Sequence, residues 1–171
     1  MEKGYLRVYT GNGQGKTTAA FGVLVRALCA GKRGYVGQFI KDEAYNETFL
    51  TRHFKHLCIE QLGKGCFIDR KPDSLDKAAA QAALRHVTEL MASGQYDIVV
   101  LDELTIAIHY NLVSTQAVLD ALEQRCLSTE VIITGRYAPP ELIAAADLVT
   151  EMKEIKHYYL QGVLSRDGFD H

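Results

Sequence analysis

The chain has 171 residues, of which 47% are hydrophobic and 23% charged, with a net charge of -2 at pH 7. This balance suits one folded domain over residues 1–171, and it lacks the clustered basic face of a protein whose main partner is nucleic acid. No apolar run reaches the roughly 18 residues of a membrane span. The four cysteines form no CxxC pair. We therefore expect a cytoplasmic protein with reduced thiols and with neither a membrane nor a nucleic-acid partner.

Short β-rich runs alternate with helical runs along the first half of the chain. The pattern predicts strands over residues 5–9, 34–40 and 57–62. It also predicts a helix over residues 17–30 that stops at Gly31, and a long alanine-rich helix over residues 73–92. Asp73 or Ser74 is the expected N-cap of the long helix, and Ser93-Gly94 is its expected end.

The second half of the chain continues the alternation. A near-continuous apolar run over residues 98–101 is typical of a strand buried on both faces. A helix is expected over residues 114–124 and a strand over residues 130–134. Pro139-Pro140 is expected to open a short helix, because a missing N–H costs little there. A last buried strand is predicted over residues 148–152, followed by a tail that forms a hairpin near Gln161-Gly162.

This alternation of strands and helices predicts an α/β fold, with a mostly parallel sheet and helices on both of its faces. Ligands of such sheets bind beyond the carboxyl ends of the strands. The chemically interesting segments all follow predicted strands; they are residues 11–18, Lys41, Asp102-Glu103 and Gly135-Arg136. We therefore expect these segments to meet at one edge of the sheet.

The segment TGNGQGKTT, residues 10–18, lies between a predicted strand and a predicted helix. Its three alternate glycines allow backbone N–H groups to approach an anion closely; they are Gly11, Gly13 and Gly15. The start of the following helix adds the positive end of its dipole. Lys16 can reach phosphate oxygens, and the Thr17 hydroxyl is a magnesium ligand in such loops. The segment is therefore interpreted as an ATP-binding phosphate loop rather than as a glycine-rich turn that only links strand to helix.

Two carboxylates, Asp102 and Glu103, end the buried strand. An apolar strand that ends in a carboxylate supplies the outer ligand of magnesium in nucleotide-binding proteins of this type. The alternative interpretation is that one of the two acids caps the next helix. Two adjacent acids directly after IVVL favour the metal site.

Two cations also follow predicted strands. Arg136, in TGRYAPPE, presents a fork of donors that suits a phosphate, or else it forms a surface ion pair. Lys41, in QFIK, either contacts the nucleotide or is solvated. The motifs alone leave both alternatives open.

Taken in order along the chain, TGNGQGKTTAAFG, QFIK, YDIVVLDE, TGRYAPPELIAAADLVTEM and KHYY resemble the ATP:corrinoid adenosyltransferases. The resemblance is narrowest to the cob(I)yrinic acid a,c-diamide (cob(I)alamin) adenosyltransferase type, and it runs from about residue 5 to residue 168. The loop of this family also lacks the first glycine of the usual phosphate loop, where this chain has Thr10.

The resemblance implies a homodimer with a RecA-like P-loop NTPase fold. It implies transfer of the 5′-deoxyadenosyl group of ATP to the cobalt(I) of cob(I)alamin or a corrinoid precursor. Inorganic triphosphate is released, Mg²⁺ (or Mn²⁺) is the metal ion, and a reductase is a potential electron-donating partner. In relatives the triphosphate lies in the loop in the reverse of the usual sense, which directs C5′ toward the cobalt.

The resemblance also assigns roles to residues of this chain. The expected ATP and corrinoid contacts are Gly11, Asn12, Gly13, Gly15, Lys16, Thr17, Thr18, Lys41, Arg136 and Phe67. The expected metal ligands are Thr17, Glu103 and Asp102. Lys16, Glu103 and Arg136 are the residues expected to support catalysis.

Two departures from the family pattern are visible. Gln14 replaces the lysine that is usual in the phosphate loop, which removes one positive charge. The segment beside the corrin is GKGCFID rather than a GFTW-like sequence, and Phe67 is its aromatic residue. The residues alone leave two rival functions on the same loop: a small-molecule kinase or ATPase, which attacks phosphorus, and a regulatory ATP-binding module.

Overall fold

The computed structural model describes residues 3–41, 45–63 and 72–170. Within them, six strands form one sheet in the order β3-β2-β4-β5-β1-β6. The strands are β1 (Leu6–Thr10), β2 (Gly34–Gln38), β3 (Leu57–Gln61), β4 (Ile98–Asp102), β5 (Glu130–Thr134) and β6 (Leu148–Glu151). Every neighbouring pair is parallel, so all the described strands end at the same edge. The predicted parallel α/β sheet is confirmed.

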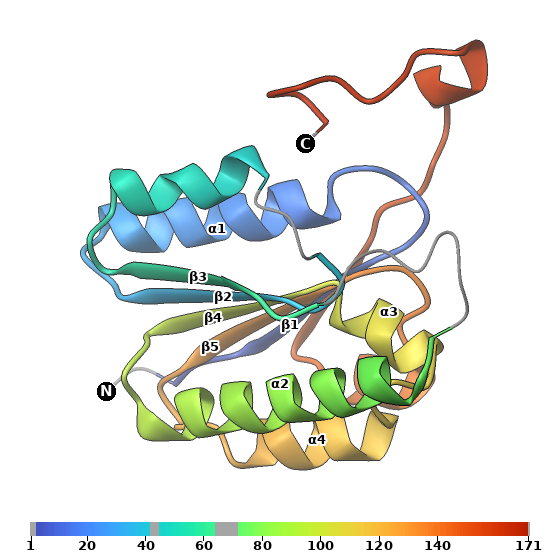
Figure 1. Cartoon of the computed structure of the whole chain (residues 1–171). Helices are drawn as coiled ribbons and strands as arrows, with labels where there is room; N and C mark the ends of the chain where they lie inside the picture. The colour runs from blue at the N-terminus through green and yellow to red at the C-terminus, as the bar shows by residue number, and fades with distance from the viewer. Residues whose placement is uncertain (1–2, 42–44, 64–71, 171) are drawn as a thin grey trace.

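Helices cover both faces of this sheet (Figure 1). Helix α1 (Lys16–Cys29) and the 3₁₀ helix η1 (Asn46–Arg52) lie on one face. The opposite face carries α2 (Ser74–Ser93), α3 (Leu104–His109), α4 (Thr115–Glu123) and α5 (Pro140–Ala145). Alternate residues of β4 serve the two cores, since Val100 packs on the α1 side and Val99 on the α2 side. This two-sided burial is the reason why the strand reads as a continuous apolar run.

The boundaries of α2 follow from local chemistry. The Asp73 carboxylate accepts hydrogen bonds from the backbone N–H groups of Leu75 and Asp76, both at 2.9 Å. The Asp76 carboxylate accepts in return from the Asp73 N–H at 2.8 Å, which completes a capping box. Gly94 ends the helix in the left-handed conformation, with φ of 65°. The predicted helix and both of its end signals are confirmed.

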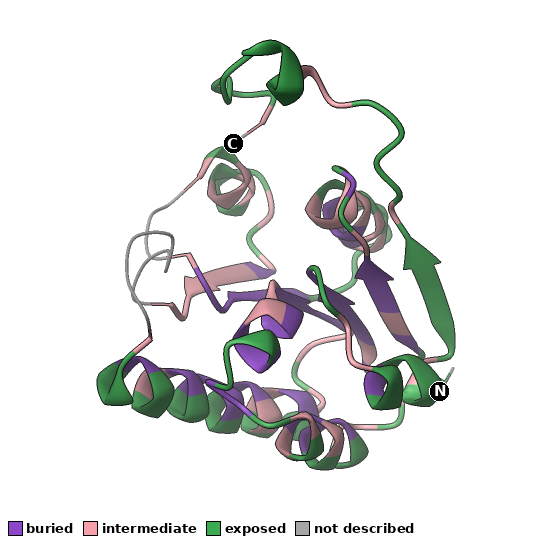
Figure 2. Ribbon diagram, turned by 90° about the vertical axis from the view of Figure 1, so that its right-hand side faces the viewer, coloured by how far each residue is buried: buried purple, intermediate pink, exposed green. Residues whose placement is uncertain are grey.

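Two expectations for the last part of the chain are wrong. The strand β6 was expected to be buried, but all four of its residues are exposed because β6 lies at the edge of the sheet (Figure 2). The tail was expected to form a hairpin near Gln161-Gly162. It forms instead a short 3₁₀ helix, η2 (Tyr158–Gln161), which Gly162 ends with φ of 82°. Gly162 does mark a change in the direction of the chain, but it ends a helix rather than turning a hairpin.

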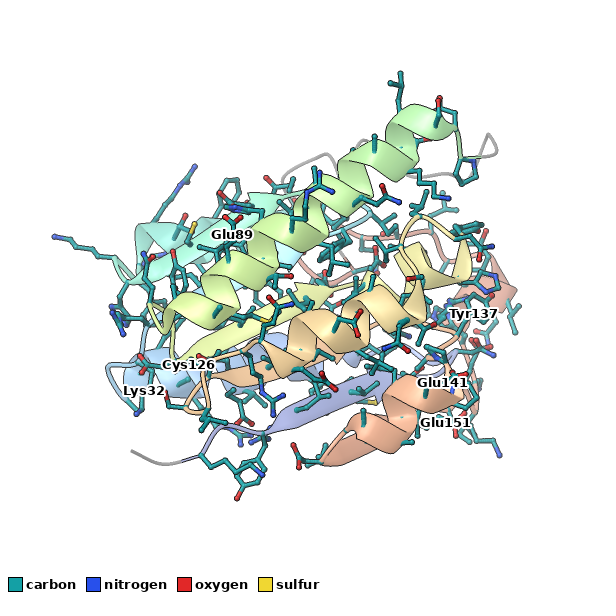
Figure 3. The ribbon with its side chains drawn as sticks, turned by 90° about the horizontal axis from the view of Figure 1, so that it is seen from below. Lys32, Glu89, Cys126, Tyr137, Glu141 and Glu151 are labelled. Atoms are coloured by element: carbon teal, nitrogen blue, oxygen red, sulfur yellow. The ribbon has the colours of Figure 1, made fainter. Side chains whose placement is uncertain are left out.

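Side chains of α2, α4 and α5 point outward and between the helices on the face seen in Figure 3. The labelled Tyr137 lies at the end to which the strands point, and Lys32 and Cys126 lie at the opposite end. In the part of the chain that the structure describes, no helix is both long and apolar enough to cross a membrane.

Candidate functional site

A pocket of about 600 Å³ lies at the carboxyl edge of the sheet. Its wall includes seven of the residues predicted from the sequence: Gly15, Lys16, Thr17, Thr18, Lys41, Glu103 and Arg136. They come from the N-cap and first turn of α1, from the segment after β2 and from the ends of β4 and β5. A volume of this size is typical of sites for nucleotides and other small ligands. The expectation that the segments meet at one edge is confirmed.

The phosphate loop is shaped by its glycines and by the segment after β6. Gly11 and Gly15 have φ of 99° and 113°, a region that favours glycine. The Gly13 N–H donates to the Met152 carbonyl at 2.7 Å, and a Cβ on Gly13 would lie 2.8 Å from that oxygen. Gly11 and Gly13 therefore pack against the chain after β6, and neither they nor the exposed Asn12 belong to the wall of the pocket. Their predicted contacts with the nucleotide stay predictions.

Lys16 is the first residue of α1, and the pocket is open to the first turn of this helix through residues 15–18. The early N–H groups of a helix have no partner within the helix, so they suit an anion. The Lys16 ammonium donates to the Gly13 carbonyl at 2.6 Å, which closes the loop. Burial, and then the nearby Arg136, lowers the pKa of Lys16. An anionic ligand would oppose both effects by stabilising the charged form of Lys16.

Asp102 is fully buried behind the pocket wall. Its Oδ1 accepts hydrogen bonds from the hydroxyls of Thr17 at 2.9 Å and Thr134 at 2.6 Å. Its Oδ2 lies 3.4 Å from the Gln38 amide nitrogen and 3.5 Å from the Lys41 ammonium. These four partners account for both carboxylate oxygens, so Asp102 orients Thr17 rather than facing the pocket itself.

Glu103 differs sharply from its neighbour. It stands at the N-cap position of α3 with φ of 60°, and its side chain makes no capping hydrogen bond. The interpretation of the acids as helix caps is therefore wrong, and the Glu103 side chain lines the pocket instead. Burial, and then Asp102, raises the pKa of Glu103, while Lys41 opposes the shift. A cation in the pocket would stabilise its charged form.

The two cations of uncertain role both reach the pocket. Lys41 is not a solvated side chain, because it pairs with Glu47 at 2.8 Å and its side chain is 15% exposed. Burial opposes its charge, but Asp102 and Glu47 prevail and raise the pKa of Lys41. Arg136 follows β5 with an exposed side chain, and its carbonyl accepts from the Thr105 hydroxyl at 2.6 Å. That bond fixes the backbone from which the guanidinium extends.

The donors at this edge suit magnesium. Among the described residues, no group of three or more His, Cys, Asp or Glu is placed to hold a metal ion. Magnesium needs fewer protein ligands than such a group supplies, because it usually binds one or two protein oxygens together with water and substrate phosphates. The Thr17 hydroxyl and the Glu103 carboxylate are oxygen donors of the right kind on the pocket wall. The residues present therefore fit the ion.

The contrast between the two acids makes a prediction. Glu103→Gln should raise the magnesium concentration needed for half-maximal turnover about tenfold or more, with little loss of stability. Asp102→Asn should instead lower the free energy of unfolding by about 1–3 kcal/mol, because its new amide group would face the Gln38 and Lys41 donors. Magnesium titrations of activity and urea unfolding would measure the two effects. The reverse ranking in the titration would make Asp102 the ligand and Glu103 a structural residue.

Several residues of the pocket wall were missed in the sequence. Asn46 and Glu47 reach it from η1, Tyr45 reaches it from the N-cap position of that helix, and residues 168–170 reach it from the tail. The η1 segment carries no strand or phosphate-loop signal, so its place at the pocket is known only from contacts in the structure, such as the ion pair between Glu47 and Lys41. Phe67, predicted to contact the corrin, lies outside the described residues.

Comparison with known proteins gives one consistent result. The family described as ATP:corrinoid adenosyltransferase BtuR/CobO/CobP matches residues 2–171. A corrinoid adenosyltransferase of Pseudomonas aeruginosa is 37% identical over 171 residues, covering 99% of this chain and 84% of the relative. A corrinoid adenosyltransferase of Escherichia coli (strain K12) is 36% identical over 172 residues, covering 99% and 87%. The corrinoid adenosyltransferase CobA of Salmonella typhimurium is 37% identical over 172 residues, again covering 99% and 87%.

Proposed function

The chain belongs to the ATP:corrinoid adenosyltransferase family, and we propose that its pocket at the carboxyl edge of the sheet aligns ATP with the cobalt of a reduced corrinoid. The enzyme transfers the 5′-deoxyadenosyl group of ATP to cobalt(I) and releases triphosphate, as in adenosylcobalamin synthesis. The observation that carries this function is the match over residues 2–171, together with 36–37% identity to corrinoid adenosyltransferases over 99% of the chain. The kinase and ATPase alternatives are not favoured.

The proposed chemistry needs no protein nucleophile. Cobalt(I) attacks C5′ with its own electron pair, so a cobalt–carbon bond forms while the bond from C5′ to oxygen breaks. Triphosphate leaves with the electron pair of the broken C5′–O bond, and negative charge grows on its oxygens. Aligning the reacting atoms is worth roughly 7–11 kcal/mol, whereas one well-aimed donor is worth about 3–4 kcal/mol. Positioning of the substrates therefore dominates the proposed catalysis.

The charged side chains of the pocket then act on the leaving group. Lys16, Arg136 and the first turn of α1 are the proposed triphosphate contacts, because they bring positive charge to one pocket. Thr17 and Glu103 are the proposed protein ligands of magnesium, which would neutralise charge on the phosphate oxygens. Asp102 holds the Thr17 hydroxyl at 2.9 Å and so orients it within this arrangement.

The identity of the phosphate product tests this function. With cobalt(I) corrinoid present, the enzyme should release triphosphate, and an ATP analogue with a non-hydrolysable β–γ bridge should remain a substrate because that bond is never broken. Without the corrinoid, ATP should be consumed at a negligible rate. Formation of the cobalt–carbon bond is followed by absorbance, and phosphate products are separated by ion-exchange chromatography. Rapid corrinoid-independent release of ADP and phosphate would overturn the function and favour an ATPase.

We also propose a cytoplasmic homodimer. The exposed edge strand β6 supports association with a second copy, since Leu148 and Val149 are 40% and 39% exposed in the single chain.

Because the nucleophile is cobalt(I), an electron donor must reduce the cobalt to this state, and a reductase is the proposed partner. The corrinoid bound is cob(I)alamin or one of its precursors.

A further inference from the structure

The C-terminal segment returns to the pocket after it leaves the sheet. Figure 1 shows the chain after β6 rising through η2 and then running back above α1. Two side-chain hydrogen bonds fasten its end to the walls of the pocket. The Gln14 amide donates to Asp170 at 3.0 Å, and the Asn46 amide donates to Asp167 at 2.5 Å. The segment thus bridges the phosphate loop and η1, and its residues Gly168, Phe169 and Asp170 line the pocket.

Asp170 is the centre of these contacts. Besides the Gln14 amide, it accepts from the Tyr158 hydroxyl and from the side chain and backbone of Arg166, at 3.0 and 3.1 Å. The hydrogen bond from Tyr158, and then that from Arg166, lowers the pKa of Asp170. Four donors from three parts of the chain hold one carboxylate, and the neighbouring residue Phe169 is held at the pocket with it.

Phe169 is exposed and yet belongs to the pocket wall. Its side chain is 79% exposed, although the Arg166 guanidinium lies 5.2 Å from the centre of its ring. Exposed apolar area costs about 25 cal/mol per Å², so a ligand that covers the ring gains affinity. The fixed backbone on both sides limits the entropy lost when it does so.

The wall of the pocket carries both charged and aromatic side chains. Lys16, Glu103 and Arg136 bring charge from the edge of the sheet, which suits the triphosphate and its metal ion. Aromatic rings come from other elements: Phe21 from α1, Tyr45 from the segment before η1, and Phe169 from the tail. A nucleobase presents a flat face that stacks on such rings. The aromatic side chains of the wall therefore suit the nucleobase of ATP, and the charged side chains suit its triphosphate.

We propose that Phe169 contacts the nucleoside of bound ATP and that Asp170 is the positioning residue that holds Phe169 at the pocket. This inference rests on the proposed function only in taking ATP as the ligand of the pocket. Gln14 then has a role that its place in the phosphate loop alone does not suggest. It links the loop to the tail, because its amide nitrogen donates to Asp170 and its amide oxygen accepts from the Tyr158 hydroxyl at 3.4 Å.

Binding measured without a corrinoid tests the proposal. Phe169→Ala should weaken magnesium–ATP binding about tenfold, as loss of one base–aromatic stack does, and leave magnesium–tripolyphosphate binding unchanged because that ligand has no base. Isothermal titration calorimetry measures both dissociation constants. Leu160→Ala is the matched control, because Leu160 is an apolar tail residue of similar exposure, 78%, that does not line the pocket. It should change neither constant.

The positioning role of Asp170 has its own readout. Asp170→Ala should reproduce the selective loss of ATP affinity, and Asp170→Glu should recover part of it because the carboxylate is kept. The double variant with Phe169→Ala should lose no more than Phe169→Ala alone, since both changes remove the same contact. Additive losses would separate the two residues and overturn the positioning role.

Other outcomes overturn the Phe169 contact. Unchanged ATP affinity, or equal losses for ATP and tripolyphosphate, would exclude a contact with the nucleoside. Unchanged ATP affinity with an altered sedimentation coefficient would make Phe169 a contact between copies of the chain. If ATP binds as described but no adenosylated corrinoid forms, the proposed function fails while the nucleoside contact stands.

Discussion

Replacing Lys16 by Ala is expected to lower kcat/KM for ATP by about 10²–10³-fold while the protein stays folded. The Lys16 ammonium lies in the pocket at the first turn of α1, where burial and Arg136 already lower its pKa. Burial disfavours the charged form of the Lys16 ammonium in the free protein, and a bound triphosphate would stabilise that charged form. Steady-state kinetics with cobalt(I) corrinoid, together with calorimetric ATP titration, would measure the loss.

Lys32→Ala is the matched control for this change. Lys32 is an exposed lysine near the amino end of β2, at the opposite edge of the sheet from the pocket (Figure 3). Its replacement removes the same charge from the molecule and should leave kcat/KM within about twofold, because solvent and salt screen a charge so far from the site. Near-normal turnover in folded Lys16→Ala would remove the phosphate loop from the mechanism.

The second large effect is expected on stability. Gly11→Ala should lower the free energy of unfolding by about 3–5 kcal/mol, at the upper end of single substitutions. Gly11 has φ of 99°, and a Cβ there would lie 2.4 Å from the Met152 carbonyl oxygen and 2.9 Å from the Met152 nitrogen. Neither backbone atom can move freely, because the Met152 N–H donates to the Thr10 carbonyl and its own carbonyl accepts from Gly13. Urea unfolding would measure the loss.

Gly31→Ala separates the two causes of that loss. Gly31 also has a left-handed backbone, with φ of 79°, but a Cβ there would meet nothing within 4 Å. Its replacement should therefore lower the free energy of unfolding by only about 1–2 kcal/mol, because only the left-handed conformation is unfavourable for alanine there. The difference between the two variants measures the contact between the phosphate loop and the segment after β6. Equal losses would mean that this contact contributes nothing to stability.

Much of the fold was predictable because its signals are local. The apolar run IVVL predicts that β4 is buried on both faces, and Asp73 and Gly94 predict where α2 begins and ends. The phosphate loop and the acids after β4 were found for the same reason, since each motif is contiguous and follows a strand. The parallel topology then brought them together, as any parallel sheet does at its carboxyl edge.

The errors have different physical causes. The short segment LVTE of β6 does not reveal whether its strand lies inside the sheet or at its edge, since strand order is a long-range property. A glycine with positive φ ends a helix as readily as it turns a hairpin, which is why η2 was missed at Gly162. The place of Glu47 beside Lys41 had no local signal of any kind.

The sequence by itself determined the α/β class, the phosphate loop at residues 10–18 and the family to which the chain belongs. Backbone preference and hydrophobic period act over a few residues, so a single sequence displays them directly. Only the tertiary structure decided that both carboxylate oxygens of Asp102 are occupied by partners within the protein while Glu103 lines the pocket. It alone brought Asp170 to Gln14, 156 positions away. Such contacts depend on how whole elements pack, and no local pattern encodes that packing.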